Sequence, residues 1–284
     1  MFETNPFAEL SASISPEIMQ GYVILMFVFV IVGTILDMMH KKSAQYFFEN
    51  AEKAKKSAKR TVTGGEKISM AVATVANEVL TSGEFACRPS RRMSHLLTMY
   101  GFIIFVATTA WLIFGYTSQT ESAPTALTAL WHIGAIMLCL GGYWFWFFIR
   151  VDVSSEGVKW YNFNGRGDIF IVSLITTGTF ALLWSGTLAS GGLLNVIFFV
   201  LFIVSSTMLF STVFWSKFAH MFFKPAAAFQ KRTTKADGSY ENLPEVGELS
   251  DPAVQAKFPD IPEYMGTNPP NMGQGIKREA PSHY

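Results

Sequence analysis

The chain has 284 residues, of which half are hydrophobic and 15% are charged, whereas about a quarter is usual in a soluble domain. The large apolar fraction excludes a disordered chain. The 22 Lys and Arg residues nearly balance 21 Asp and Glu, so there is no basic excess for binding nucleic acid. Two cysteines, Cys87 and Cys139, are too few for a disulfide framework or for a protein-held iron–sulfur cluster.

Five apolar runs predict an all-α integral membrane protein with five transmembrane helices. Each run is near the ~20 residues that a helix needs to cross hydrocarbon, and none has the polar stripe of a soluble helix. Their only acidic residue is Asp37, close to an end. The segment before them contains Glu3, Glu9 and Glu17 but no Lys or Arg, which does not fit a cleaved signal peptide. The runs are Tyr22–Met39, Leu96–Tyr116, Ala126–Ile149, Ile169–Leu188 and Leu193–Trp215.

The basic residues predict the orientation of these helices. All 22 Lys and Arg residues fall in three segments, 41–92, 150–166 and 217–278. Helices that cross the membrane alternately place all three segments on one side. The positive-inside rule then predicts an outer N-terminus and a cytoplasmic C-terminus, in a multi-pass protein of the cell inner (cytoplasmic) membrane.

Two further patterns concern packing. Gly134, Gly141 and Gly142 on the third run are expected to permit close contact between helices. Tryptophan and tyrosine residues lie mostly near the ends of the runs, which predicts an aromatic belt at the membrane interfaces. The belt residues are Trp111, Tyr116, Trp131, Trp144, Trp146, Trp184 and Trp215.

The sequence divides into three expected parts. An outer N-terminal segment covers residues 1–21, and a five-helix membrane domain covers 22–225 and includes a cytoplasmic helical loop at 41–94. An extended cytoplasmic tail covers 226–284 and contains seven prolines after residue 243. Because proline fixes φ and removes a backbone donor, no long helix is expected there. The tail is predicted to be disordered or, as we slightly favour, to lie extended on a partner.

Two helices are predicted within the loop 41–94. The segment Ser43–Arg60 is rich in Ala, Lys and Glu, which favour a helix. After Gly64 and Gly65, apolar residues recur at helical spacing and form one stripe. The stripe predicts either a helix on the membrane surface or a docking surface for a soluble partner, and we weigh the two equally. Its members are Ile68, Ala71, Val72, Val75, Ala76, Val79 and Leu80.

Histidine is the residue type that best suits cofactor chemistry near the runs. No Asp, Glu, Lys or Arg lies in the middle of a run, which disfavours a transporter or proton pump. His95 precedes the second run and His220 follows the fifth, both at the expected cytoplasmic end. A six-coordinate b-type haem needs two imidazoles from different helices, so this pair suits one haem.

Cations lie next to these histidines. Arg91 and Arg92 precede His95, where they suit the propionates of a haem. The alternative is that all these residues are positive-inside anchors and interfacial histidines, and spacing alone favours this alternative. His40 lies at the same expected level. His132, at the outer end of the third run, is a candidate for a quinone contact, although a packed interfacial histidine is favoured.

The two histidine segments are Arg91–Phe102 and Trp215–Pro225. Together with Trp131–Gly134 and Tyr143–Asp152, they resemble the five-helix membrane cytochrome b superfamily that includes the gamma subunit of respiratory nitrate reductase. Within that superfamily, the chain looks most similar to the membrane anchor subunit of dissimilatory adenylylsulfate reductase. The resemblance covers residues 22–225.

The resemblance implies haem b bound by transmembrane histidines and electron exchange with quinone. The nitrate reductase relative carries two haems, whereas this chain lacks the outer pair of histidines. One inner haem is therefore the most that is implied, with His95 and His220 as its metal ligands and Arg91 and Arg92 as cofactor-binding partners. No catalytic residue is implied. The implied partner is a soluble flavin and iron–sulfur oxidoreductase on the cytoplasmic face.

The sequence thus predicts a membrane anchor and electron-transfer subunit. It links a cytoplasmic oxidoreductase, adenylylsulfate reductase of sulfur metabolism by resemblance, to the quinone pool. The alternative is a structural membrane anchor without a cofactor, and a small-molecule permease is less favoured. In either leading case the chain is a non-catalytic or electron-transfer subunit that contacts membrane lipid.

Overall fold

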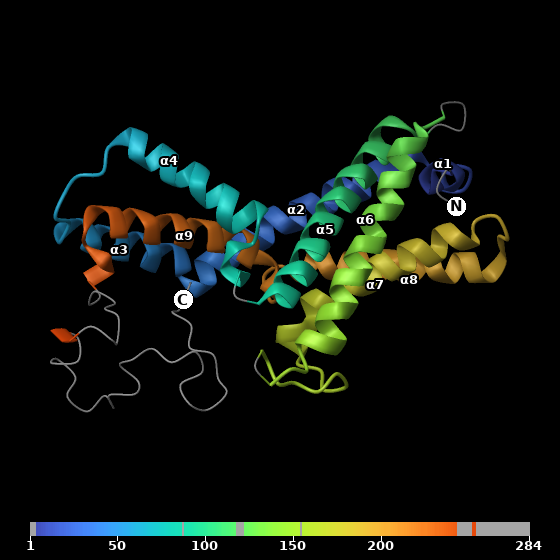
Figure 1. Ribbon diagram of the computed structural model, residues 1–284. Coiled ribbons are helices and arrows are strands. Elements are labelled where there is room, and N and C mark those ends of the chain that lie inside the picture. Colours follow the sequence, from blue (N-terminus) through green and yellow to red (C-terminus); the bar gives the residue numbers. More distant parts are fainter. Residues whose placement is uncertain (1–3, 87, 118–121, 154, 243–251, 254–284) are drawn as a thin grey trace. The chain divides into compact units, whose positions relative to one another are not determined.

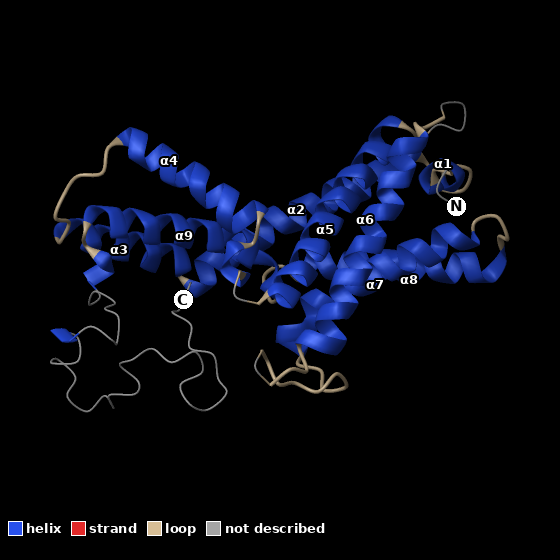
Figure 2. Ribbon diagram, in the orientation of Figure 1, coloured by secondary structure: helices blue, strands red, loops and turns tan. Residues whose placement is uncertain are grey.

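The computed structural model describes a chain made of helices. Every regular element in its described ranges is a helix (Figures 1 and 2), which confirms the all-α fold class. The described residues are 4–86, 88–117, 122–153, 155–242 and 252–253. The chain forms two compact units, which we call the membrane unit (Met1–Ala44 with Arg88–Lys224) and the loop–tail unit (Gln45–Cys87 with Pro225–Tyr284).

Five helices of the chain are long and apolar enough to cross a membrane, as predicted, so the fold is that of a multi-pass membrane protein. Each of these helices begins before its apolar run. Its first residue is set by local start residues such as proline or a capping residue, and its backbone hydrogen bonds do not depend on the hydrocarbon. Pro16 and Pro89 occupy the first turns of two spans, where proline costs no hydrogen bond. The spans are α2 (Pro16–Lys41), α5 (Pro89–Gly115), α6 (Thr125–Trp144) continued by the π-helix η3 (Phe145–Ile149), α7 (Gly165–Thr187) and α8 (Gly192–Ser211).

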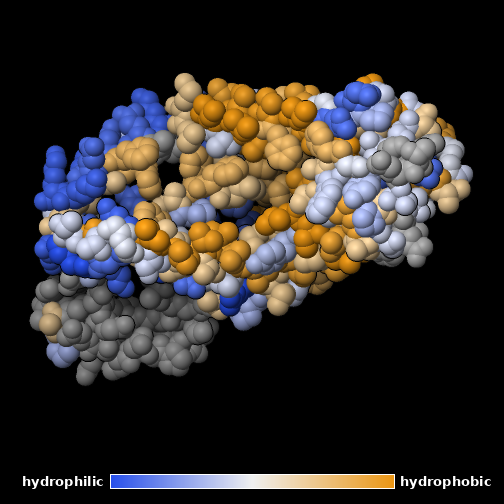
Figure 3. All heavy atoms as spheres, turned by 90° about the horizontal axis from the view of Figure 1, so that it is seen from above, coloured by the Kyte–Doolittle hydropathy of each residue, from blue (hydrophilic) through white to orange (hydrophobic). Residues whose placement is uncertain are grey.

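The five spans form a closed ring in the order α2, α5, α6, α7, α8, and α8 packs back against α2. Figure 1 shows the two hairpins α5–α6 and α7–α8. Aromatic rings fill the interior: Phe105 lies 5.2 Å from Trp131 and 6.3 Å from Phe202, and Trp184 stacks on Phe202 at 5.7 Å. Large apolar side chains are exposed on the outside of the spans (orange in Figure 3), as solvation by lipid requires.

Helices α5 and α6 touch at the level of their backbones. A Cβ atom added to Gly134 of α6 would lie 2.7 Å from the backbone nitrogen of Phe105, and one added to Gly101 of α5 would lie 2.5 Å from the α6 backbone. A Cβ atom at Gly141 would lie 2.6 Å from the carbonyl oxygen of Ser94. Small residues permit this approach in lipid, where van der Waals packing drives helix association. The predicted role of these α6 glycines is confirmed.

One end of the ring gathers the basic residues of the membrane unit, and we call it the basic end. His40 of α2 contacts Phe214, just after α8, with ring centroids 5.4 Å apart. Arg88, before α5, donates to Ser155 in the loop after α6 at 3.0 Å. The first contact brings the C-terminal ends of α2 and α8 together, and the second brings the start of α5 next to the loop after α6. The alternate crossing of the membrane and the cytoplasmic location of this end stay predictions from the positive-inside rule.

The N-terminal segment packs into the opposite end. Helix α1 (Pro6–Leu10) buries Phe7, whose ring meets Trp131 at 5.7 Å and Trp184 at 5.6 Å. Trp131 and Trp184 are almost fully buried, so their assignment to an interfacial belt was wrong: they face the interior of the ring. Trp111 and Trp215 are exposed on the outside, as a belt requires.

The loop–tail unit is held together by side-chain and backbone bonds. Arg232 pairs with Glu78 at 2.8 Å, and the N–H groups of Lys59 and Arg60 donate to the carbonyl oxygen of Asp237. Its elements are α3 (Ser43–Lys56), α4 (Gly64–Thr74), the π-helix η1 (Val75–Leu80), η2 (Gly83–Phe85), most of α9 (His220–Asp237) and η5 (Tyr240–Asn242). The two predicted helices of the loop 41–94 thus correspond to α3 and to α4 with η1.

Helix α9 changes the description of the tail. The tail was expected to be extended from residue 226, but the helix continues to Asp237. Its Pro225 lies near the N-terminal end of the helix, and the segment from there to Asp237 contains no further proline to interrupt it. The proline-rich remainder, 243–284, lies outside the described residues except for 252–253.

Helix α4 begins at a capping box and exposes its apolar stripe. Thr63 accepts from the N–H of Glu66, and the Glu66 carboxylate accepts from the N–H of Thr63. The pKa of Glu66 lies below its ordinary value, chiefly because its carboxylate accepts from the backbone N–H of Thr63 and, to a smaller extent, from the side chains of Arg60 and Thr63. The stabilisation of the helix start by this carboxylate is therefore lost only as the pH falls through the lowered pKa. Ile68 and Val72 are 69% and 64% exposed.

We predict that Gly134→Leu destabilises the membrane unit by at least about 1–3 kcal/mol, because the new side chain meets the α5 backbone. Unfolding in mixed micelles titrated with sodium dodecyl sulfate measures the change. Gly21→Leu is the matched control, since a Cβ atom at Gly21 meets nothing within 4 Å. Equal stabilities of the two variants would contradict the backbone contact.

Candidate functional site

His95 lies in the second turn of α5, at the basic end of the ring. Its side chain is half-buried. Arg91 and Arg92 precede it by four and three residues, so all three side chains share one face of the helix. Both arginines are also half-buried. The structure therefore brings the predicted cations and the predicted ligand of α5 together on one surface.

His220 follows a short 3-10 turn, η4 (Lys217–Ala219), at the same end of the ring. Ser216 caps this turn by accepting from the N–H of Phe218 at 3.2 Å. His220 Nδ1 hydrogen-bonds to the carbonyl oxygen of Lys217, and the ring packs edge-on against Phe170 of α7 at 5.9 Å. With its proton on Nδ1, the neutral ring presents Nε2 as the coordinating nitrogen, which is the tautomer of many metal-bound histidines.

Phe218 joins the His220 segment to the rest of the ring. Its side chain is 2% exposed and contacts Phe102 of α5 at 6.1 Å, Phe170 of α7 at 5.6 Å and Phe210 of α8 at 6.0 Å. Phe102 lies seven residues after His95, which is about 10 Å along the helix. This aromatic cluster packs between α5, α7 and α8 at the level of Phe102.

Imidazole and guanidinium groups, the kinds of side chain that hold a haem and its propionates, lie at the basic end. The Nδ1–carbonyl bond fixes the tautomer of His220, His95 is half-buried, and Arg91 and Arg92 lie on the face of α5 that carries His95. These residues would be the ones to hold a haem. Interfacial histidines without a ligand make the same hydrogen bond, so the alternative stays open.

The two remaining candidate histidines differ in their surroundings. His132 is fully buried, with Nδ1 2.8 Å from the carbonyl oxygen of Thr128 and Nε2 2.7 Å from the hydroxyl of Ser185. Both ring nitrogens are thus bonded within the ring of helices, as expected for a packed histidine. His40 is exposed at the basic end and packs against Phe214.

A buried ion pair at the basic end was not predicted from the sequence. Arg150 follows η3 and is 1% exposed, and it pairs with Asp168 in the first turn of α7. Arg150 also donates to the carbonyl oxygens of Lys159 and Asn162, and its guanidinium lies 4.3 Å from the ring of Trp146. A buried arginine bonded to Asp168 and to the carbonyl oxygens of Val158, Lys159 and Asn162 fixes the loop between the spans. In the sequence, this ion pair is indicated only by two opposite charges that lie eighteen residues apart.

Asp37 is a further charged residue that the structure buries. It was placed close to a helix end by sequence, and its side chain is 1% exposed. It shares a face of α2 with Gly33, whose added Cβ would lie 2.8 Å from Val213, and with His40. The acidic residue therefore lies on the face of α2 that meets Val213 and Phe214, just after α8.

Comparison with known proteins assigns no family to the chain. No protein-family model, curated protein or solved structure matches it. The resemblance to the five-helix cytochromes b therefore stays a prediction from the histidine segments, and function has to be argued from the residues themselves.

We predict that Asp168→Asn destabilises the membrane unit by about 3–5 kcal/mol, because it leaves the Arg150 charge buried without its counter-ion. Unfolding in mixed detergent micelles measures the loss. Arg166→Gln is the control, since Arg166 is an exposed cation two residues away. An Asp168→Asn variant as stable as the control would show that the pair is not needed for the loop.

Proposed function

We propose that the chain is a membrane anchor and electron-transfer subunit. It binds a flavin and iron–sulfur oxidoreductase, adenylylsulfate reductase by resemblance, on the cytoplasmic face of the cell membrane. It passes electrons between that enzyme and the quinone pool. The observation that carries the proposal is that both candidate ligand histidines, with Arg91 and Arg92, lie at one end of a five-helix ring whose interior is otherwise packed with aromatic side chains.

The residues have separate tasks in this proposal. His95 and His220 hold the iron of one haem b, and Arg91 and Arg92 pair with its propionates. The bond from His220 Nδ1 to the Lys217 carbonyl keeps the imidazole in the ligating tautomer. Phe218 and its aromatic neighbours close the side of the site that faces the ring interior. The haem, when bound, supplies one-electron transfer.

Docking of the soluble enzyme is assigned to the loop–tail unit. Three side chains of the stripe on α4 and η1, Ile68, Val72 and Val75, are 69%, 64% and 49% exposed. An exposed apolar row on a folded unit is typical of an interaction surface. The ion pair between Arg232 and Glu78 joins α9 to η1 within this unit. The apolar row therefore belongs to a helix whose position in the unit is fixed.

The second candidate is a structural anchor without a cofactor. The observation that favours it is the hydrogen bond of His220 to Lys217 together with its packing on Phe170, which satisfy the histidine as part of the fold. A permease is disfavoured because the interior of the ring is filled by large side chains such as Trp131 and Trp184.

A reduced-minus-oxidised absorption spectrum separates the two candidates. We expect a b-type α-band from the chain purified out of a haem-sufficient host, and loss of the band in His95→Ala and His220→Ala. His40→Ala, an exposed histidine at the same end, is the control and keeps the band. A wild-type chain without the band supports the structural anchor, provided that circular dichroism shows the helices intact.

Docking is tested by co-purification of a flavin-containing enzyme from native membranes. We expect Ile68→Lys with Val72→Lys to release the enzyme, because two charges interrupt the apolar row. Ser69→Lys adds a charge at an exposed position beside the row and serves as the control. A variant that ends at Asn242 tests the tail separately, and full retention by both altered chains would exclude this docking surface.

A further inference from the structure

The loop between η3 and α7 exposes apolar side chains from a fixed backbone. Val153 is 90% exposed, Tyr161 64%, Trp160 56% and Phe163 54%. Arg150 holds the same loop through its bonds to the carbonyl oxygens of Lys159 and Asn162. Exposed rings on a restrained loop lose little conformational freedom on binding, so they are suited to contact another molecule.

These rings continue onto the outer surface of the span α6–η3. Tyr143 stacks on Phe147 with centroids 6.1 Å apart, Phe147 contacts Trp160 at 6.1 Å, and Trp160 meets Tyr161 edge-on at 5.6 Å. Tyr143 and Phe147 are 40% and 44% exposed within a helix apolar enough to cross the membrane, where an exposed side chain meets lipid. We call these four residues the aromatic ladder.

The ladder ends where the apolar span ends. Phe147 precedes the end of the span at Ile149 by two residues, which is about 3 Å of helix. Trp160 contacts Phe147 and therefore lies near the same depth, where tryptophan and tyrosine are enriched in membrane proteins. At that depth a membrane span is surrounded by the lipid of its leaflet, whereas a soluble protein would have to displace that lipid to reach Tyr143.

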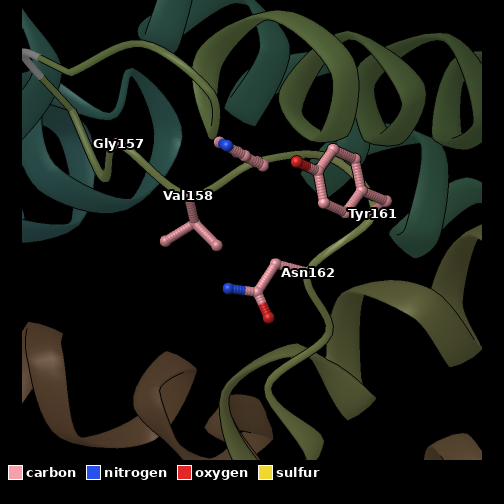
Figure 4. A pocket seen from close by; sticks show the side chains of 5 residues that line it. Gly157, Val158, Tyr161 and Asn162 are labelled. Atoms are coloured by element: carbon pink, nitrogen blue, oxygen red, sulfur yellow. The ribbon is translucent and has the colours of Figure 1, made fainter.

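Hydrogen-bond donors lie at the polar end of the ladder. Lys159 Nζ is 5.7 Å from the ring of Tyr161. An open hollow of about 480 Å³ is lined by Gly157, Val158, Lys159, Tyr161 and Asn162, and Figure 4 shows the side chains of Val158, Tyr161 and Asn162 around it. The lining combines an ammonium, a phenol and an amide and contains no carboxylate, although Glu156 and Asp152 lie nearby in the loop. This donor set suits a phosphate group.

We propose that the aromatic ladder and this hollow form a binding site for one anionic phospholipid of the leaflet at the basic end. An acyl chain lies along Tyr143 and Phe147, Trp160 sits at the glycerol level, and the phosphate is held by Lys159, Tyr161 and Asn162. The inference does not depend on the proposed electron transfer, since it uses neither histidine.

The first test is lipid retention. The purified full chain is placed in nanodiscs of equal parts phosphatidylglycerol and phosphatidylcholine and then released for native mass spectrometry. We expect one retained lipid, with phosphatidylglycerol preferred about fivefold, which is the effect of one lysine near an anionic surface. Excess inorganic phosphate should not release it, because the acyl chain contributes to binding. Equal retention of the two lipids, or release by phosphate, would overturn the site.

Matched variants assign the contacts. Lys159→Gln should remove the headgroup preference, whereas Lys67→Gln, another exposed lysine, should keep it. Trp160→Ala should lower retention of both lipids, whereas Trp111→Ala, at an exposed tryptophan far along another span, should leave their retention unchanged. A Lys159→Gln variant that still prefers phosphatidylglycerol would refute the phosphate contact.

A second measurement distinguishes lipid from a protein partner and needs no destabilising change. Acyl chains brominated close to the glycerol quench tryptophan within van der Waals reach, so the wild-type chain should lose more fluorescence in nanodiscs of such lipid than Trp160→Phe does. If the two chains are quenched equally, Trp160 faces water or protein and the proposal fails.

Discussion

The backbone contact between α5 and α6 is the interaction on which the rest of the membrane unit depends. The hydroxyl of Ser94 donates to the carbonyl oxygen of Gly141 at 2.8 Å, and Gly141 leaves no room for a side chain between the helices. His95 adjoins Ser94, and α6 continues through η3 to Arg150. One contact between two helices therefore sets the position of a candidate haem ligand and of the ion pair that shapes the neighbouring loop.

A second constraint comes from lipid, which offers no hydrogen bonds to polar groups. Along the spans, hydroxyls such as those of Thr177 and Ser206 bond carbonyl oxygens within their own helices, and His132 uses both ring nitrogens internally. Polar chemistry that is not consumed by the fold collects at the ends of the helices. For this reason the basic end carries the candidate ligand histidines, the Arg150–Asp168 pair and the ammonium group of Lys159.

Much of the fold follows from the sequence, because lipid selects long apolar runs and those runs are visible without any knowledge of packing. The glycines of α6 were also informative, since small residues such as Gly134 and Gly141 let two helices approach closely in lipid. The Arg150–Asp168 pair was missed because it joins two spans through a loop, and pattern analysis follows one helix at a time. Phe7 was missed because an isolated aromatic residue before a span carries no periodicity. The positions of His95 and His220 at one end were predictable, but the aromatic packing of Phe218 beside them was not.

The burial of Phe7 also bears on permeability. Its ring sits against Trp131 and Trp184 at the end of the ring interior, and Phe105 and Phe202 fill the layer beneath. Water has little room among these side chains, so the bundle is closed to ions and small solutes along this axis. A bundle packed in this way adds no leak pathway along its axis to the membrane that contains it.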